Sequence, residues 1–204
     1  MVTAENREPP RQRALFWTVA LVFLLPLAIA AYLYYVPSSW RPAHSVNYGS
    51  LIDPARPLPE VALPTVDGAI TPADFLRHRW TLIYVGSGAC DERCHAALYQ
   101  IRQVRLALNN DSDRVQRLFI ATEPCCDQAF LAREHVGLVI ARGASPEAAR
   151  VLADFPRDGG AVAAAGRIYV ADPLGNLMMF HARDSTPQQL LGDLKRLLKL
   201  SSIG

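Results

Sequence analysis

The stretch TLIYVGSGACDERC, residues 81–94, decides the fold of this chain. Its first part, Thr81–Val85, is apolar and rich in strand-forming residues, at a length suited to a buried strand. From Glu92 to Leu108 the apolar residues recur at helical spacing. Cys90 and Cys94 therefore stand where a buried strand turns into a helix. The unpaired amides and positive dipole end of that helix favour thiolate over thiol, so function is expected here first.

Two thiols four residues apart at a helix start share one helix face. Their Cα atoms are expected about 6 Å apart, within reach of a disulfide bond. Thiolates at this spacing also suit one Cu(I) ion, which prefers soft sulfur ligands. The plainer alternative is a buried pair that only packs. Covalent haem attachment is not expected, because it needs two residues between the cysteines and Cys90 and Cys94 have three.

A second cysteine pair, Cys125 and Cys126, follows another predicted buried strand, Arg117–Thr122. In a parallel sheet with right-handed crossovers, the carboxyl ends of successive strands meet at one edge. The vicinal pair is therefore expected on the same side of the sheet as Cys90. It would supply resolving thiols for a Cys90–Cys94 disulfide or extra ligands for a soft metal. The alternative is that one or both are small residues buried in a loop.

Histidines add no metal-binding pattern, because none stands at a diagnostic spacing from the cysteines. His181 ends the last predicted strand, and we expect it to face away from the edge that carries Cys90. His95 follows Cys94 directly and is expected on a different helix face. A surface or core histidine is the default interpretation for each.

The order of predicted elements indicates an α/β sandwich with a parallel centre and one antiparallel edge. Caps mark several helix starts, among them Asp127, Ser145 and Thr186. The predicted strands are 61–63, 81–85, 117–122, 138–141, 167–171 and 177–180, and the last two are joined by a tight turn.

The N-terminal part predicts a single transmembrane helix over residues 14–36. This run has no charged residue and exceeds the roughly 20 residues that cross a bilayer. Arginines concentrate before it, so residues 1–13 are expected to be cytoplasmic and the rest exported to the periplasm. A cleavable signal peptide, with Ala28–Ala30 as the cleavage site, is the alternative. The length of the apolar run favours an uncleaved anchor in the inner (cytoplasmic) membrane.

Prolines punctuate residues 37–57, which predict an extended linker, and the folded domain is expected over residues 58–204. The formal net charge of +2, with scattered basic residues, gives no sign of a nucleic-acid surface. Four cysteines are too few for a disulfide scaffold. Their clustering points instead to local chemistry.

Several segments together resemble the Sco/SenC family: Leu63–Gly68, Trp80–Val85, the pair Cys90-x-x-x-Cys94, and Ile168–Gly175. That resemblance implies a membrane-anchored thioredoxin fold and a role in assembling the copper centre of cytochrome c oxidase. It further implies a partner that is the copper subunit of the oxidase or another copper or thiol assembly protein. Copper is the one cofactor it suggests.

The chain departs from the family pattern at two places. Asp91 stands where the family usually has proline, and Ala163–Arg167 lacks the histidine that serves as third copper ligand. Only Cys90 and Cys94 are carried over, as catalytic residues of a thiol-disulfide oxidoreductase. Two alternatives stay open. One is a Cu(I) metallochaperone that uses these thiolates with Cys125 or Cys126, and the other is a non-catalytic assembly factor.

Overall fold

The computed structural model describes, of the 204 residues, 10–35, 46–157, 159–201 and 203. The chain divides into two compact units, Met1–Ser45 and Val46–Gly204.

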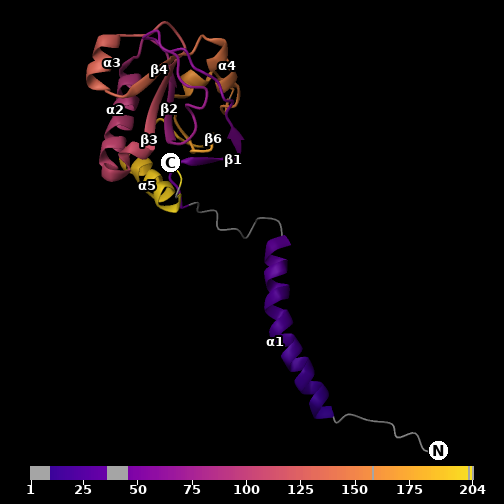
Figure 1. Cartoon of the computed structure of the whole chain (residues 1–204). Coiled ribbons are helices and arrows are strands. Elements are labelled where there is room, and N and C mark those ends of the chain that lie inside the picture. The colour runs from indigo at the N-terminus through magenta and orange to yellow at the C-terminus, as the bar shows by residue number, and fades with distance from the viewer. Residues whose placement is uncertain (1–9, 36–45, 158, 202, 204) are drawn as a thin grey trace, which may run out of the picture. The chain divides into compact units, whose positions relative to one another are not determined.

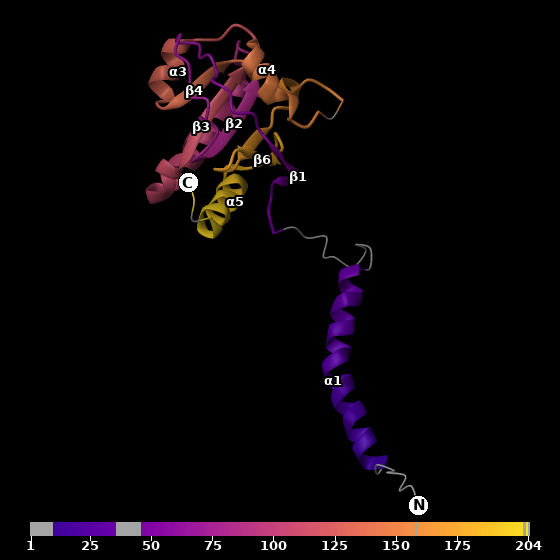
Figure 2. The ribbon, with the colours of Figure 1, turned by 45° about the vertical axis from the view of Figure 1, so that its right-hand side comes forward.

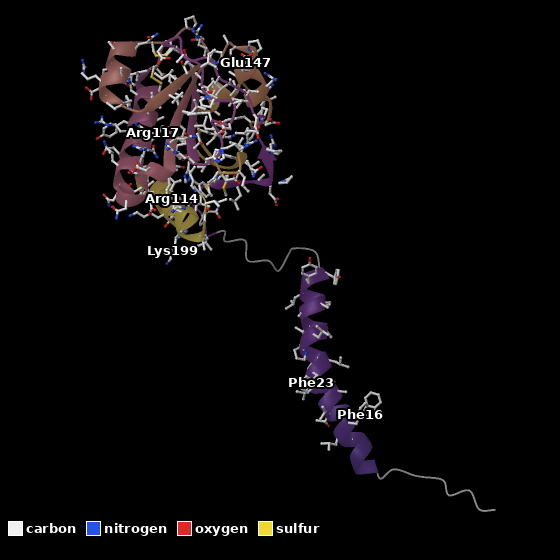
Figure 3. The ribbon with its side chains drawn as sticks, in the orientation of Figure 1. Phe16, Phe23, Arg114, Arg117, Glu147 and Lys199 are labelled. Atoms are coloured by element: carbon white, nitrogen blue, oxygen red, sulfur yellow. A yellow bond between two sulfur atoms is a disulfide. The ribbon has the colours of Figure 1, made fainter. Side chains whose placement is uncertain are left out.

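The first unit contains one long helix, α1, which spans Pro10–Tyr35 and has Pro26 in its interior. Over Ala14–Tyr35 the helix is long and apolar enough to cross a membrane. Its large apolar side chains are exposed, as Phe16 and Phe23 show in Figure 3. Exposed apolar surface on this scale is unfavourable in water and favourable in lipid. The helix therefore fits the predicted membrane anchor.

Other parts of the predicted N-terminal organisation fall outside the described residues. They are residues 1–9 of the predicted cytoplasmic tail, Val36 at the end of the predicted anchor, and residues 37–45 of the predicted linker.

The second unit is built on one mixed sheet of six strands in the order β1-β6-β5-β2-β3-β4. The strands are β1 (Ser50–Pro57), β2 (Trp80–Gly86), β3 (Val115–Ala121), β4 (Leu138–Arg142), β5 (Ile168–Ala171) and β6 (Asn176–His181). β2, β3 and β4 run parallel, whereas β5 is antiparallel to β2, and β6 is antiparallel to β5 and β1. The predicted parallel centre with an antiparallel side is confirmed.

Helices cover both faces of this sheet (Figures 1 and 2). The helices are α2 (Glu92–Ala107), α3 (Gln128–Glu134), α4 (Pro146–Ala153) and α5 (Pro187–Leu200), with short 3-10 helices η1 (Asn109–Arg114) and η2 (Val162–Ala165).

β2 lies at the centre, and all 7 of its residues are buried. Successive side chains of a strand point to opposite faces, so β2 contributes to two apolar clusters. Leu82 and Tyr84 belong to the cluster that includes residues of α2 and α5. Ile83 and Val85 belong to the cluster that includes residues of α4. A strand buried on both faces explains why its sequence reads as a continuous apolar run rather than an alternation.

The predicted caps are confirmed at three helix starts. Asp127 accepts a hydrogen bond from the N–H of Phe130 at the start of α3. Ser145 does the same for α4, and Thr186 forms a full capping box with Gln189 at the start of α5. These side chains satisfy amide donors that have no partner within the helix.

The predicted linker is wrong for its last part, because Ser50–Pro57 forms the edge strand β1. β1 pairs with β6 only, with a shift of register between Leu51 and Arg56. Proline lacks an N–H, which excludes it from central strands but is tolerated at a sheet edge or a bulge. The prolines at positions 54 and 57 therefore mark an edge strand as well as a linker. The folded unit begins before residue 58.

The strand predicted over residues 61–63 is also wrong. This segment has no regular strand structure, and the chain beyond it makes only isolated bridges, Pro64 with Ile70 and Thr65 with Ala141. Val61 and Leu63 are buried in the core all the same. Their apolar character reflects packing against the domain and not membership of the sheet.

Candidate functional site

The candidate site begins where β2 ends and the chain turns into α2. The N–H of Cys90 donates to the carbonyl of Ser87 at 3.1 Å, and the N–H of Ala89 donates to the Ser87 hydroxyl at 3.2 Å. This tight turn brings Cys90 to the residue before the helix cap. Cys90 has a φ of +44°, in the left-handed region that non-glycine residues seldom occupy. Such backbone positions concentrate at functional sites.

Cys90 and Cys94 are joined by a disulfide bond, with their Cα atoms 5.0 Å apart. Both residues are buried, and Cys90 is the more exposed of the two, at 6% against 2%. The structure thus brings together the two residues that the sequence singled out. Cys94 lies inside α2 and faces the core, whereas Cys90 precedes the helix.

Asp91, at the position where the Sco/SenC pattern has proline, caps α2. Its carboxylate accepts a hydrogen bond from the N–H of Cys94 at 3.1 Å. The cap satisfies one amide of the first helical turn and places a negative charge near the positive end of the helix dipole. Asp91 is exposed, so this carboxylate reaches the solvent beside the disulfide.

The second cysteine pair lies in the loop between β3 and α3. Cys125 and Cys126 are bonded to each other as a vicinal disulfide, and both are half-buried. They pack against the same apolar cluster that contains Cys90 and Cys94. The next residue, Asp127, caps α3.

The two cysteine loops lie against each other. The N–H of Thr122 donates to the carbonyl of Gly86 at 2.9 Å, and the hydroxyl of Ser87 donates to the carboxylate of Glu123. β2 and β3 are parallel and in register from Trp80–Val115 to Gly86–Ala121, so both loops leave the sheet at one level. The expectation that the vicinal pair lies on the Cys90 side of the sheet is therefore confirmed.

Gly88 permits this contact, and sequence reasoning missed its role. A Cβ atom at Gly88 would lie 2.2 Å from the carbonyl oxygen of Glu123 and 2.4 Å from that of Pro124. Only glycine allows two backbones to approach so closely. The signal in the sequence is the spacing of two glycines around Ser87, which by itself does not identify the partner loop.

The predicted position of His181 is wrong. β5 reverses direction relative to β2 and β6 reverses again, so β6 runs in the same direction as β2. Tyr84 pairs with Ile168, and Ile168 pairs with His181, which places His181 at the level of the β2 carboxyl end. Its Nε2 lies 3.3 Å from the carboxylate of Asp193, and burial lowers the pKa of this imidazole.

No three-ligand metal set is present among the residues that the structure describes: His, Cys, Asp and Glu side chains nowhere gather in groups of three that could hold a metal ion. The segment where the family pattern has a histidine is the short helix η2 followed by Gly166, in a left-handed conformation. Within the described part of the chain, Cys90 and Cys94 thus offer two sulfur ligands, and no third ligand gathers with them.

A groove lies between α2 and α3, and His95, the residue after Cys94, is one of its lining residues. It has a volume of about 460 Å³ and is lined by His95, Tyr99, Arg102, Asp127, Phe130, Glu134 and His135. His95, the neighbour of Cys94, packs edge-on against Phe130 at 5.2 Å between ring centroids. His95 is exposed whereas Cys94 is buried, so the two lie on different faces of α2, as predicted.

Tyr84 packs behind the first cysteine loop. A Cβ atom at Gly86 would lie 2.8 Å from its ring, so Gly86 too is held close to its surroundings. Burial raises the pKa of the Tyr84 hydroxyl, and the negative charge of Asp91 raises it further. Tyr84 is therefore a neutral wall of the site.

A mixed sheet with a disulfide between the end of a central strand and the first turn of the next helix defines a thioredoxin-like protein. A family model supports this class: the one described as "Transmembrane-like, thioredoxin-like, C-terminal domain" matches residues 80–201. The chain belongs to this family.

Solved structures show the same fold. ScoI of Bradyrhizobium japonicum with copper bound is 24% identical, with a TM-score of 0.54, and the match covers 70% of this chain and 99% of that chain. Yeast Sco1 with copper bound is 18% identical, with a TM-score of 0.59, covering 72% and 95%. A thioredoxin from Neisseria meningitidis is 15% identical, with a TM-score of 0.52, covering 71% and 91%. The comparison with curated proteins gives no match. The resemblance to Sco proteins is confirmed at the level of the fold.

Proposed function

We propose that this chain is a membrane-anchored, Sco-like thiol-disulfide oxidoreductase that aids assembly of the copper centre of cytochrome c oxidase. One observation carries the proposal. A disulfide between Cys90 and Cys94 joins the loop after β2 to the first turn of α2 in a thioredoxin-like fold. The copper subunit of the oxidase, or another thiol protein of copper assembly, is the proposed partner.

Cys90 acts as the nucleophile in this proposal. It is the more exposed cysteine and lies before the amino end of the 16-residue helix α2, whose dipole stabilises a thiolate. The reduced protein attacks a partner disulfide with the Cys90 thiolate and forms a mixed disulfide. Cys94, buried one turn further along α2, then attacks the Cys90 sulfur and releases the reduced partner.

The proposed location follows from α1. Its segment Ala14–Tyr35 is long and apolar enough to span a membrane, and Arg7, Arg11 and Arg13 precede that segment. With the N-terminus in the cytoplasm, the thioredoxin-like domain lies in the periplasm. That compartment is oxidising, which suits a protein that cycles between dithiol and disulfide.

Trapping the mixed disulfide tests the proposal. The full chain is purified in detergent with Cys125 and Cys126 replaced by Ser, reduced, and mixed with glutathione disulfide. The additional variant Cys94→Ala is expected to keep one glutathione on Cys90, because no resolving thiol is left. With Cys94 present, the adduct resolves to the Cys90–Cys94 disulfide. Intact-mass spectrometry distinguishes these products.

The matched control is Cys90→Ala in the same background, which leaves the more deeply buried Cys94. We expect its glutathione adduct to form at least ten-fold more slowly, because access limits attack. Equal rates for the two single-cysteine variants, or no adduct on Cys90, would refute Cys90 as the nucleophile.

Cu(I) binding is the second candidate function. Reduced Cys90 and Cys94 offer two soft thiolates 5.0 Å apart at their Cα atoms, and several structures of this fold are described with copper bound. Anaerobic Cu(I) titration of the reduced full chain tests it. One equivalent bound in the wild type and none in Cys90→Ser/Cys94→Ser would support it. Equal Cu(I) binding by the wild type and by Cys90→Ser/Cys94→Ser would refute this second candidate function.

Burial of the pair gives a non-catalytic assembly factor some support, because a buried disulfide can serve structure alone. The discriminating variant is again Cys90→Ser/Cys94→Ser, expressed in a host strain that lacks the wild-type chain. Under the proposed exchange function, oxidase activity in the membranes is lost. Full oxidase activity with this variant would favour the non-catalytic role.

A further inference from the structure

The loop that carries Cys125 and Cys126 is held against the loop that carries Cys90 by backbone as well as side-chain contacts. Thr122 donates its N–H, at 2.9 Å, and its hydroxyl, at 3.2 Å, to the carbonyl of Gly86. The carbonyls of Glu123 and Pro124 lie directly over the Cα of Gly88. Consecutive parallel strands thus deliver both cysteine pairs to one edge of the sheet.

The two pairs also differ in access. Cys90 and Cys94 are buried at 6% and 2% exposure, whereas Cys125 and Cys126 are half-buried. All four pack on the apolar cluster between the sheet and helices α2 and α5. A second disulfide beside a candidate catalytic disulfide, and more accessible than it, is more than packing requires.

We propose that Cys125–Cys126 is a second redox centre that exchanges two electrons with Cys90–Cys94. This inference deepens the proposed function and rests on it, because it needs Cys90 and Cys94 to cycle between dithiol and disulfide. The reduced vicinal pair supplies the electrons that Cys90 and Cys94 pass to the partner disulfide. Its half-exposed position lets a further thiol protein reduce it again.

The internal step is a pair of reversible thiol-disulfide exchanges. When the vicinal pair is reduced, electrons move from it to the Cys90–Cys94 disulfide, and when it is oxidised, they move in the opposite direction. The Cys90 thiolate attacks one sulfur of the Cys125–Cys126 disulfide, so that a bond from Cys90 to that sulfur forms and the other cysteine leaves as thiolate. The Cys94 thiolate then attacks the Cys90 sulfur, and the second cysteine of the vicinal pair leaves. Cys90 and Cys94 are oxidised to a disulfide, and Cys125 and Cys126 are reduced. Two electrons move, and the two thiolates formed take up the two protons that Cys90 and Cys94 release.

Variants that keep only one cysteine of each pair test the step, because its mixed disulfide then cannot resolve. C94A/C126A keeps Cys90 with Cys125, and C94A/C125A keeps Cys90 with Cys126. The full chain in detergent is reduced and then oxidised in a glutathione buffer at low protein concentration. Proteolysis and mass spectrometry identify the cross-link. We expect an intramolecular disulfide from Cys90 in at least one variant, at a rate within ten-fold of Cys90–Cys94 closure in C125A/C126A.

The matched control is C90A/C126A, which keeps Cys94 with Cys125. Cys94 is inside α2 and faces the core, so its cross-link is expected at least ten-fold more slowly than that of Cys90. Near-ultraviolet circular dichroism of each variant shows whether the domain is folded, and only folded variants are compared.

The outcomes separate this inference from the proposed function. No Cys90 cross-link in either folded variant overturns the relay. The proposed function still stands in that case if C125A/C126A forms its Cys90–Cys94 disulfide through a Cys90 glutathione adduct. If C125A/C126A accepts no glutathione at Cys90, the proposed function fails, and the relay fails with it. Cross-linking that is equally fast from Cys94 and Cys90 also overturns the relay, because the loop contact then selects no partner.

Discussion

Two strand–loop–helix segments of the folded domain, which we call the β2 unit and the β3 unit, have the same local pattern. In one, β2 leads through a short loop to Cys90, Asp91 and α2, and in the other β3 leads to Cys126, Asp127 and α3. In both units a cysteine directly precedes an aspartate that caps the helix.

The units differ in where the second cysteine lies. In the first, Cys94 is inside a 16-residue helix, and the disulfide links the loop to the helix core. In the second, Cys125 stays in the loop and α3 has only 7 residues. One local plan therefore produces a buried pair fixed to a long helix and a half-buried pair in a loop. The position of one cysteine sets the exposure of the pair.

The largest effect on stability is expected from Gly88→Ala, which breaks the contact between the loops of the β2 unit and the β3 unit. The new Cβ would meet two backbone carbonyls, which cannot move aside as a flexible side chain can. We expect a loss of about 3 kcal/mol in the free energy of unfolding, typical of severe overpacking. That corresponds to a fall of about 6–12 °C in the thermal midpoint of the full chain in detergent.

Gly160→Ala is the control, because nothing lies within 4 Å of a Cβ built there. Its effect is expected to stay within about 0.5 kcal/mol. Similar midpoints for the two variants would mean that the loops are not held together at Gly88.

Removing the two helix caps compares the units directly. Asp91→Ala leaves the N–H of Cys94 without its partner, and Asp127→Ala does the same for Phe130. Loss of a cap costs about 1 kcal/mol. We expect Asp91→Ala to lower the thermal midpoint by about 2–4 °C, because α2 packs in the core and unfolds with the domain.

Asp127→Ala is expected to act locally, because α3 is short and mostly exposed. Its signature is faster hydrogen exchange in α3 with a smaller change in midpoint. A larger midpoint shift for Asp127→Ala than for Asp91→Ala would contradict the inference that α2 is packed more tightly than α3.

Acid is expected to lower the free energy of unfolding through His135, the residue after α3 in the β3 unit. Burial lowers the pKa of His135 below its ordinary value of 6.5, and the positive charges of Arg117, Arg102 and His95 lower it further, against a smaller opposing effect of Glu134. As the pH falls through 6.5 the unfolded chain takes up a proton that the folded chain resists. The contribution of His135 to the free energy of unfolding is therefore fully present above pH 6.5, and it decreases as the pH falls below that value.

Thermal midpoints of the full chain between pH 7.5 and pH 5 measure this dependence. His135→Asn is expected to reduce the slope without removing it, because burial also lowers the pKa of His181. An unchanged slope in His135→Asn would show that His135 makes no contribution.

The smallest effect is expected from Ser87→Ala. Its hydroxyl donates to the carboxylate of Glu123, which is exposed, so solvent competes for the contact. We expect a loss of about 0.5 kcal/mol, at the low end for a hydrogen bond. Glu123→Ala in the same measurement should give a smaller value, since Ser87→Ala also removes the hydrogen bond from the N–H of Ala89 to the Ser87 hydroxyl. A loss near that of Gly88→Ala would mean that the side chains, and not the glycine, hold the loops together.

Local rules predicted much of the domain. The buried strands at 81–85 and 117–122 and the caps at Asp127 and Ser145 depend on neighbours within a few residues, and the structure has them close to where the sequence placed them. The failures were non-local. Residues 50–57 become a strand only because β6, far along the chain, offers an edge.

His181 shows the same limit. The end of the sheet at which His181 lies depends on two reversals of strand direction, from β2 to β5 and from β5 to β6. It therefore depends on the order of the strands in the sheet. Its partner Asp193, on α5, is buried with it, and that carboxylate also accepts the N–H groups of Tyr48 and Gly49. No spacing within the sequence signals such a group of contacts.

The sequence by itself determined that Cys90 and Cys94 lie together at a strand–helix junction, because only three residues separate them where a buried apolar run gives way to a helical pattern. The sequence did not show that Cys90 lies before the helix, because that depends on the turn at Ser87. It also determined the apolar helix at the N-terminus, because length and composition are local properties. Only the tertiary structure decided that Gly88 packs under Glu123 and Pro124 and sets the vicinal pair beside the first. That contact joins segments from two different strands, and its cause is the register of β2 with β3 rather than the identity of neighbouring residues.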